Sequence, residues 1–303
     1  MNSIDEKTTT RQQPTALDER MGSGVPIIRV FPKRNKWIPT DKLAFVGNPD
    51  LFIPRDHKIP VRISIVFTWD IAEGKRLFKS WESFYEDVKL GGPAFDDPGG
   101  EFTPGMYIKE GVTITSRGCI KRCPWCFVPK REGKLRELDI KPGHIIQDNN
   151  LLACSEKHIR AVFDMLKKLN KPAKFSGGLD TTLLKEWHRE LFDSIKIGEL
   201  WFACDTRAAL KPLERAARIL EGISQQKRRC YVMIGYNGES IRDAEDRLEK
   251  VYRLGFDPFC QLYQSEVKKE YGKEWRALAR KWSRPAAYRA PQNDKRHLRR
   301  DNE

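Results

Sequence analysis

From residue 112 to residue 282 the sequence alternates short apolar runs with segments of helical periodicity. The apolar runs predict six strands, at residues 112–115, 144–147, 173–176, 200–203, 231–234 and 258–263. Each is followed by a helix or a long loop, and this order predicts an α/β fold with a parallel sheet covered by helices. Because six units are too few for a closed eight-stranded barrel, we expect a partial (β/α)6 parallel barrel. Its chemistry should lie at the C-terminal ends of the strands.

The predicted helices of this region have recognisable ends and faces. Ser155 stands where a helix cap is expected, and the apolar residues that follow it are spaced along one helical face. A last amphipathic helix is expected over residues 267–282. His158 and His188 fall on predicted helices, and we expect both side chains to face solvent.

The rest of the chain divides around this region. Residues 1–24 are polar and aperiodic, which predicts disorder. Residues 25–105 should form a small N-terminal α/β region, in which a strand at 61–69, a helix at 72–85 and a strand at 87–90 make a parallel β-α-β unit. Residues 106–282 would form the barrel, and residues 283–303 a basic C-terminal tail.

Charge and composition limit the partners and the compartment. The net charge is +14, and the stretch from Val267 to Arg300 holds twelve Lys or Arg against three acids. With Trp275, Trp282 and Tyr288, this end could bind nucleic acid by charge and stacking, or it could be a solvated surface helix. The sequence has no apolar run long enough to span a membrane, and its seven cysteines are odd in number. We therefore expect a cytoplasmic protein in a reducing compartment, with no membrane partner.

Three cysteines follow the first predicted barrel strand in the pattern C-x3-C-x2-C: Cys119, Cys123 and Cys126. The spacing favours an iron–sulfur cluster with one iron lacking a protein ligand. Structural zinc, which needs four ligands, and buried structural thiols are the alternatives. The basic residues around the cysteines are expected to favour thiolates over thiols: Arg117, Lys121 and Arg122. Cys154, Cys204, Cys230 and Cys260 are isolated and should be packed as small apolar residues.

The cysteine motif, with Trp125 before its last cysteine, resembles that of the radical S-adenosylmethionine (radical SAM) superfamily. Three further elements resemble the family and stand in order at predicted strand ends. They are the glycine stretch Phe175–Asp180, the polar stretch Cys204–Arg207, and the turn Ile234–Ser240 with the sequence IGYNGES. Where the commonest family form has a single Glu after the glycines, this chain has Leu179 and Asp180. The resemblance covers residues 111–282.

The resemblance implies a [4Fe–4S] cluster bound by the three cysteines and S-adenosylmethionine (SAM) bound at its open iron. SAM would be cleaved to a 5′-deoxyadenosyl radical that abstracts hydrogen from a substrate. An electron donor such as flavodoxin or ferredoxin would be needed. The residues implied in cofactor binding are Trp125, Phe127, Gly177, Gly178, Asp180, Asp205, Arg207, Gly235, Gly238 and Glu239.

The N-terminal region resembles a degenerate cobalamin-binding type of domain. It lacks the D-x-H-x-x-G motif, so no cobalamin is expected. The rival interpretation is a zinc-stapled, basic nucleic-acid-binding module without catalysis, in which the glycine turns have no assigned role.

Overall fold

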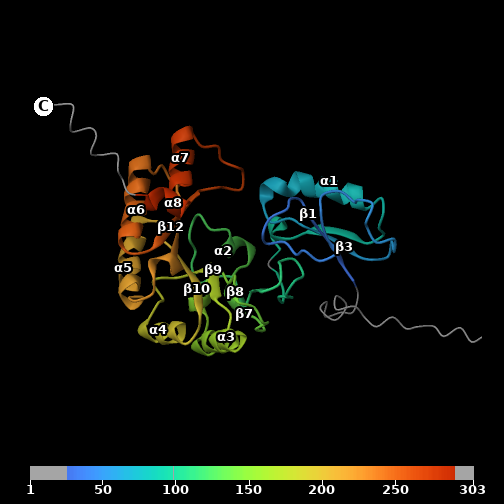
Figure 1. Cartoon of the computed structure of the whole chain (residues 1–303). Helices are drawn as coiled ribbons and strands as arrows, with labels where there is room; N and C mark the ends of the chain where they lie inside the picture. Colours follow the sequence, from blue (N-terminus) through green and yellow to red (C-terminus); the bar gives the residue numbers. More distant parts are fainter. Residues whose placement is uncertain (1–25, 98, 291–303) are drawn as a thin grey trace, which may run out of the picture.

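The protein is described by a computed structural model that covers residues 26–97 and 99–290. The expected disorder of residues 1–24 and the part of the basic tail from residue 291 onward lie outside these described residues. Figure 1 shows a smaller lobe, drawn in blue and cyan, beside a larger lobe that contains the remaining helices. Each lobe has its own cluster of buried apolar side chains.

The smaller lobe contains a four-stranded sheet in the order β2-β1-β3-β4, paired in parallel throughout. The strands are β1 (Ile28–Phe31), β2 (Ala44–Val46), β3 (Val61–Ser64) and β4 (Val88–Gly91), and helix α1 (Ile71–Trp81) connects β3 to β4. The predicted parallel β-α-β unit is confirmed, whereas β1 and β2 were not predicted. The strand expected to reach residue 69 ends at Ser64, because the chain turns there into the short 3-10 helix η1 (Thr68–Asp70).

The larger lobe contains a six-stranded sheet in the order β12-β11-β10-β9-β8-β5, also parallel throughout. Its strands are β5 (Val112–Thr113), β8 (Ile145–Ile146), β9 (Ala173–Leu179), β10 (Ile197–Ala203), β11 (Arg228–Ile234) and β12 (Asp257–Leu262). All six predicted strands are present, so the α/β class and the parallel sheet are confirmed. Because neighbours in the sheet are also neighbours in the chain, all their C-terminal ends lie along one edge.

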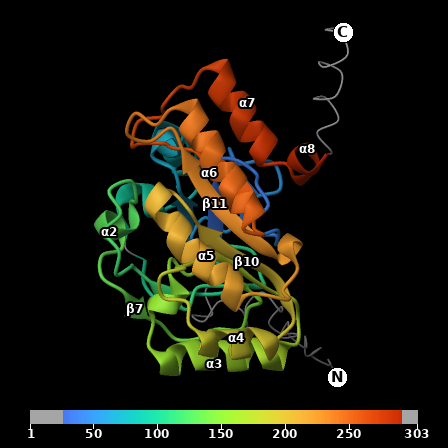
Figure 2. The same cartoon turned by 90° about the vertical axis from the view of Figure 1, so that its left-hand side faces the viewer.

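Helices follow one another along one side of this sheet (Figure 2), on the side away from the smaller lobe (Figure 1). They are α3 (Glu156–Leu169), α4 (Glu186–Asp193), α5 (Leu210–Ile219), α6 (Ile241–Arg253), α7 (Lys273–Trp282) and the short α8 (Pro285–Arg289). The predicted cap of α3 is confirmed, since the side chain of Ser155 accepts a hydrogen bond from His158 N at 3.2 Å.

Two expectations about histidines are wrong. His158 is buried, and its Nε2 lies 3.2 Å from Oγ1 of Thr115, just after β5. His188 is only 2% exposed, and its Nδ1 accepts a hydrogen bond from Lys185 N at 2.9 Å. Both rings lie on the inner face of their helices, where an imidazole can supply hydrogen bonds that an apolar residue cannot.

The helix expected at residues 267–282 is shorter than predicted. It begins at Lys273 rather than near residue 267, and Val267 is an exposed loop residue. Trp282 is only 4% exposed and stacks on Tyr288 with ring centroids 5.4 Å apart. Trp282 is thus packed in the interior and Tyr288 is partly buried against it, so the expected stacking of these two rings on bases is not supported by their packing. No helix in the described part of the chain is long and apolar enough to cross a membrane.

Candidate functional site

The three cysteines lie on a loop closed at its base by a short antiparallel ladder. Strands β6 (Ser116–Arg117) and β7 (Arg136–Glu137) pair across this base, and a single-turn helix, α2 (Val128–Arg131), lies between them. Gly118 has φ +75° at the crossing point, and a Cβ there would lie 2.2 Å from the carbonyl oxygen of Lys134. Only glycine fits this position, so the loop geometry depends on it.

Glu132 ties the cysteine loop to the next strand of the sheet. Its Oε2 accepts hydrogen bonds from Gly118 N at 2.9 Å and from Nδ2 of Asn149 at 2.6 Å. Asn149 follows β8, so one carboxylate joins the entry of the loop to the end of that strand. The 3.8 Å ion pair of Glu132 with Arg117 adds to this connection.

All seven cysteines are free thiols in the structure, but they fall into two environments. Cys119 and Cys123 are half-buried and Cys126 is exposed, whereas Cys154, Cys204, Cys230 and Cys260 are buried. The isolated cysteines are therefore packed in the interior, as predicted. The three cysteines of the loop are the accessible ones.

The expectation that basic neighbours favour thiolates is wrong for Cys123 and Cys126. Burial raises the pKa of the Cys123 thiol above its ordinary value, and the nearby Cys126 and Cys119 raise it further. The pKa of Cys126 is also raised, first by desolvation and then by Cys119, Asp205 and Glu132. Lys121, which pairs with Asp180 at 3.1 Å, lowers the pKa of Cys123, but burial outweighs this. Thiols kept protonated by their neighbours become good ligands only when a cation replaces the protons.

The spacing of the sulfurs bears on what they can hold. A single zinc ion with bonds of about 2.3 Å requires ligand atoms within about 4 Å of one another. Among the residues that the structure describes, the one set of three potential ligands within 4.8 Å of one another is Asp148, Cys154 and His158; the loop cysteines are not such a set. The loop sulfurs are therefore spread more widely than one tetrahedral ion requires, as suits a multi-iron cluster.

The buried set of Asp148, Cys154 and His158 has a structural role. Oδ1 of Asp148 accepts from Thr115 N at 2.6 Å, and Oδ2 accepts from the hydroxyls of Thr115 at 2.6 Å and Ser116 at 2.8 Å. Burial raises the pKa of Cys154 to about 12. A carboxylate whose oxygens already accept three hydrogen bonds is a poor metal ligand. Asp148 instead fixes the segment that follows β5, from which the cysteine loop departs.

Strand β9 passes very close to the segment that follows β8. A Cβ on Gly177 would lie 2.0 Å from the carbonyl oxygen of Asp148, so only glycine allows this approach. Gly178 follows with φ +119°, and Asp180 comes directly after the end of the strand. This crossing brings the β9 end beside the cysteine loop.

Asp180 and Asn150 meet next to Cys119. Nδ2 of Asn150 lies 3.4 Å from Oδ2 of Asp180 and 3.8 Å from Sγ of Cys119. Although burial raises the pKa of Asp180, hydrogen bonds from Thr182 and the charge of Lys121 outweigh this, and the pKa is lowered overall. Asn150 is only 4% exposed, yet its Oδ1 has no hydrogen-bond partner among the described residues. An unpaired buried acceptor beside a carboxylate is suited to a ligand ammonium group.

Asn150 was missed by the sequence analysis. The only signal for it was its place in a run of Asx residues after a predicted strand, and such residues commonly cap turns. Its neighbour Asp148 does have that capping role, as the hydrogen bonds to Thr115 show.

Trp125 connects the cysteine loop to two further strand ends. Its ring lies edge-on to Tyr236, in the turn after β11, with centroids 5.4 Å apart. Its side chain also donates a hydrogen bond to Asp205, which follows β10. Oδ1 of Asp205 accepts from Met233 N at 2.9 Å, but burial outweighs these bonds and raises the pKa of the carboxyl group. The loop thus contacts, directly or through Asn150, the ends of β8, β9, β10 and β11.

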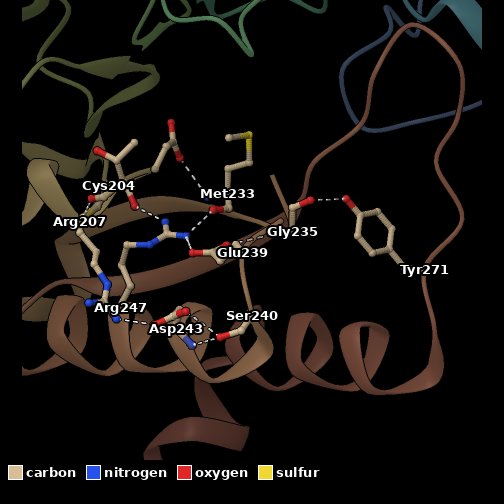
Figure 3. Close-up of polar contacts among 11 residues, drawn as sticks. Cys204, Arg207, Met233, Gly235, Glu239, Ser240, Asp243, Arg247 and Tyr271 are labelled. Atoms are coloured by element: carbon tan, nitrogen blue, oxygen red, sulfur yellow. Dashed lines mark hydrogen bonds and ion pairs between the residues drawn. The ribbon is translucent and has the colours of Figure 1, made fainter. Parts of the chain in front are cut away.

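Figure 3 shows how the turn after β11 is held. Oε2 of Glu239 accepts from Gly235 N at 3.0 Å, and Oε1 pairs with the buried Arg247. Arg247 also donates to the carbonyl oxygens of Cys204, at 2.8 Å, and Met233, at 3.0 Å. Glu239 and Arg247 therefore form a clamp on the ends of β10 and β11, and Arg247 had not been predicted.

Three other predicted cofactor-binding residues have contacts or exposure of their own: Arg207, Gly238 and Phe127. Arg207 points to Asp243 in the first turn of α6 and pairs with it on the exposed surface (Figure 3). Gly238 is exposed in the turn before α6. Phe127 caps α2, with the guanidinium of Arg131 5.9 Å from its ring centre.

No protein-family model matches the chain, and no curated protein is significantly similar to it. The function must therefore be argued from the fold and from this site.

Proposed function

We propose that the protein is a radical SAM enzyme whose larger lobe is a partial (β/α)6 barrel. The three loop cysteines would hold a [4Fe–4S] cluster, and SAM would bind between that cluster and the ends of β8 to β11. When bound and reduced, the cluster supplies one electron that cleaves the sulfonium of SAM to methionine and a 5′-deoxyadenosyl radical. The protein's residues bind and orient SAM and keep water away from the reacting atoms.

The sheet supports the barrel part of this proposal. In a doubly wound sheet the strand order reverses and helices cover both faces. Here the strand order follows the chain, and the helices lie on one side only (Figure 2). This arrangement is the one a barrel requires, with the site at the C-terminal strand ends.

The donor set supports the cluster. Cys119, Cys123 and Cys126 are the accessible cysteines, and Cys119 and Cys126 raise the pKa of Cys123, so the three lie close together in a single loop. Lys121 N donates to Sγ of Cys119 at 3.4 Å, which is the kind of contact that stabilises a ligating thiolate. Three sulfur ligands leave a fourth iron without a protein ligand, and this open position can accept the amino and carboxylate groups of SAM.

Asp180 and Asn150 are suited to the methionine end of SAM. Asp180 is a carboxylate at neutral pH because its pKa is lowered, and the orphan Oδ1 of Asn150 is an acceptor beside it. Both lie next to Cys119, so the N–H groups of the SAM amino group could donate to them while its nitrogen lone pair is free for the cluster. Gly177 allows β9 to pack against the carbonyl oxygen of Asp148, and this close approach brings Asp180 to the same corner.

Trp125, Asp205 and the Gly235 turn are suited to the adenosine end. Trp125 presents an aromatic ring beside Tyr236, and Asp205 offers a carboxyl oxygen for a ribose hydroxyl. Glu239 has its two oxygens engaged by Gly235 and Arg247, so we assign it to the shape of the turn and not to direct contact. Arg207, paired with Asp243, is the weakest of the predicted contacts.

The observation that carries the proposal is the convergence of four strand ends on one loop with three accessible thiols. To test it, the full chain is reconstituted anaerobically with iron and sulfide, reduced, and assayed for 5′-deoxyadenosine. We expect about four iron and four sulfide per chain. Cys123→Ala should abolish deoxyadenosine formation, and Cys260→Ala, a buried cysteine outside the loop, should preserve it.

A colourless protein with one zinc per chain and no response to SAM would instead support the zinc-stapled module. Equal deoxyadenosine formation by Cys123→Ala and the parent would overturn the proposal. The electron donor is proposed to be a flavodoxin or ferredoxin, and substituting each for a chemical reductant tests that part.

A further inference from the structure

We propose that the rings of Phe67 and Trp69, on the smaller lobe, form a platform on which a base of a single-stranded nucleic acid stacks. We also infer that this nucleic acid is the substrate of the enzyme, and that part rests on the proposed function. The binding itself does not depend on it.

The two rings are arranged as a ready-made stack. Their centroids are 4.7 Å apart and their planes differ by 7°. Phe67 is 50% exposed and Trp69 41% exposed, although each ring covers one face of the other. A parallel pair with this exposure offers a flat π surface, which every base can extend regardless of sequence.

The segment that carries the platform is linked by contacts to the helix that follows the cysteines. Thr68, between the two rings, donates from Oγ1 to the carbonyl oxygen of Glu266 at 2.8 Å. The carboxylate of Glu266 pairs at 2.5 Å with Lys130, in the helix that follows the cysteines. Asp96, at the other strand end of the smaller lobe, raises the pKa of Lys130 as a secondary cause after Glu266, so it also lies nearby.

These contacts place the C-terminal ends of β3 and β4 opposite the site edge of the larger sheet. The linker between the lobes follows the base of the cysteine loop. The carbonyl oxygen of Gly99 accepts a hydrogen bond from Arg136, and that of Gly100 accepts one from Arg117, both at 3.2 Å. A molecule stacked on the platform would therefore lie across from the proposed cofactor.

The surroundings are strongly basic. From Arg117 to Arg136 the chain has seven Lys or Arg and one acid. Some of this charge is compensated, as in the pairs of Lys121 with Asp180 and Lys130 with Glu266. Lys268 and Lys269 add exposed positive charge beside Glu266. A basic loop beside a segment with exposed aromatic rings suits a phosphate backbone with stackable bases.

An acidic polypeptide is the competing occupant. It would use the charge, but it has no need of two parallel rings with open faces, so the aromatic pair favours the nucleic acid. This site also differs from the contact expected from the sequence at the C-terminal end, where Trp282 and Tyr288 are packed against each other.

The test measures binding of fluorescent single strands of about 12 nucleotides, RNA and DNA, to the unreduced full chain without SAM. We expect Phe67→Ala/Trp69→Ala to bind at least about tenfold more weakly than the parent, with the slope of log Kd against log salt unchanged, because the phosphate contacts remain. The single variant Trp69→Phe, which keeps two aromatic rings, should bind more tightly than the double variant but more weakly than the parent. Phe84→Ala, a 46% exposed ring near the opposite end of α1, should bind like the parent.

Equal binding by the parent and the double variant would overturn the inference, as would absence of binding by the parent. Competition by polyglutamate equal to that by unlabelled nucleic acid would overturn it in favour of an acidic partner. Since neither reduction nor SAM is used, these outcomes are distinct from a parent protein that binds single strands but forms no deoxyadenosine, which would defeat the proposed function alone.

Discussion

Nζ of Lys121 lies 3.1 Å from Oδ2 of Asp180, so an ion pair joins the cysteine loop to the end of β9. The side chain of Asp180 is shielded, with 13% of its surface exposed, and Thr182 holds its other oxygen at 2.9 Å. The charge that would receive a ligand ammonium group is thus fixed in place before any ligand arrives.

Removing that charge should weaken SAM binding. We expect Asp180→Asn to raise the Kd for SAM about tenfold, because the amide keeps the shape of the side chain but loses its charge. Equilibrium dialysis with reconstituted, unreduced protein measures this. Asp139→Asn removes a carboxylate from a surface pair with Lys141 and should leave the Kd unchanged; an equal Kd for both variants would contradict the role given to Asp180.

The clamp made by Arg247 should be important for stability. Arg247→Met leaves the Glu239 carboxylate and two strand-end carbonyl oxygens without their donor, so we expect the free energy of unfolding to fall by about 3 kcal/mol. Urea denaturation measures the change. Arg253→Met, in the same helix, removes an exposed pair with Glu249 and should cost less than about 0.5 kcal/mol. Similar losses for the two variants would show that the clamp has no special role.

The buried His188 predicts a pH dependence of stability. Burial lowers its pKa below the ordinary value of 6.5, so the unfolded chain binds a proton at a higher pH than the folded chain. The contribution is complete above pH 6.5 and is lost as the pH falls from there through the lower folded pKa. His188→Asn keeps an acceptor for Lys185 N but cannot titrate.

Thermal melting from pH 7.5 to pH 5 should therefore show a smaller decrease in Tm for His188→Asn than for the parent. His57→Asn, at an exposed histidine of the smaller lobe, is the matched control and should follow the parent. Parallel curves for the parent and His188→Asn would rule out this account.

The crossing at Gly177 should tolerate no side chain. Gly177→Ala forces a methyl group against the carbonyl oxygen of Asp148, so the variant should lose at least about 2 kcal/mol of stability and bind SAM poorly. Gly91→Ala, in β4, has ordinary backbone geometry and open space, and it should be nearly neutral. Urea denaturation compares the two, and a stable Gly177→Ala would mean that the strands can separate at little cost.

The fold of the larger lobe could be predicted because its apolar runs and helical faces are local and regular. The six strands were found from their apolar runs, although β9, β10 and β11 extend further than those runs, since polar residues such as Glu199 and Arg229 pair in the sheet as well. Strands β1 and β2 escaped prediction because they are short and separated by a proline-rich stretch, with no helix between them.

The site could be predicted where chemistry and order along the chain coincide. Cys119, Asp180 and Trp125 do lie together, as their motif positions indicated. Asn150 and Arg247 were not predicted, because their roles depend on side-chain contacts between strands distant in sequence. Burial explains the misjudged pKa values of Cys123 and Cys126, since the sequence shows Lys121 beside the thiols but not the desolvation that outweighs its charge.

The ladder between β6 and β7 has a consequence for how the protein matures. It closes the cysteine loop through main-chain hydrogen bonds, and the loop cysteines contribute nothing to the hydrophobic interior of either lobe. The polypeptide can therefore acquire its shape before any inorganic component arrives, unlike a zinc finger, which is unfolded without its ion. If the loop holds the proposed cluster, loss of that cluster would leave a folded apoprotein that iron and sulfide can reconstitute.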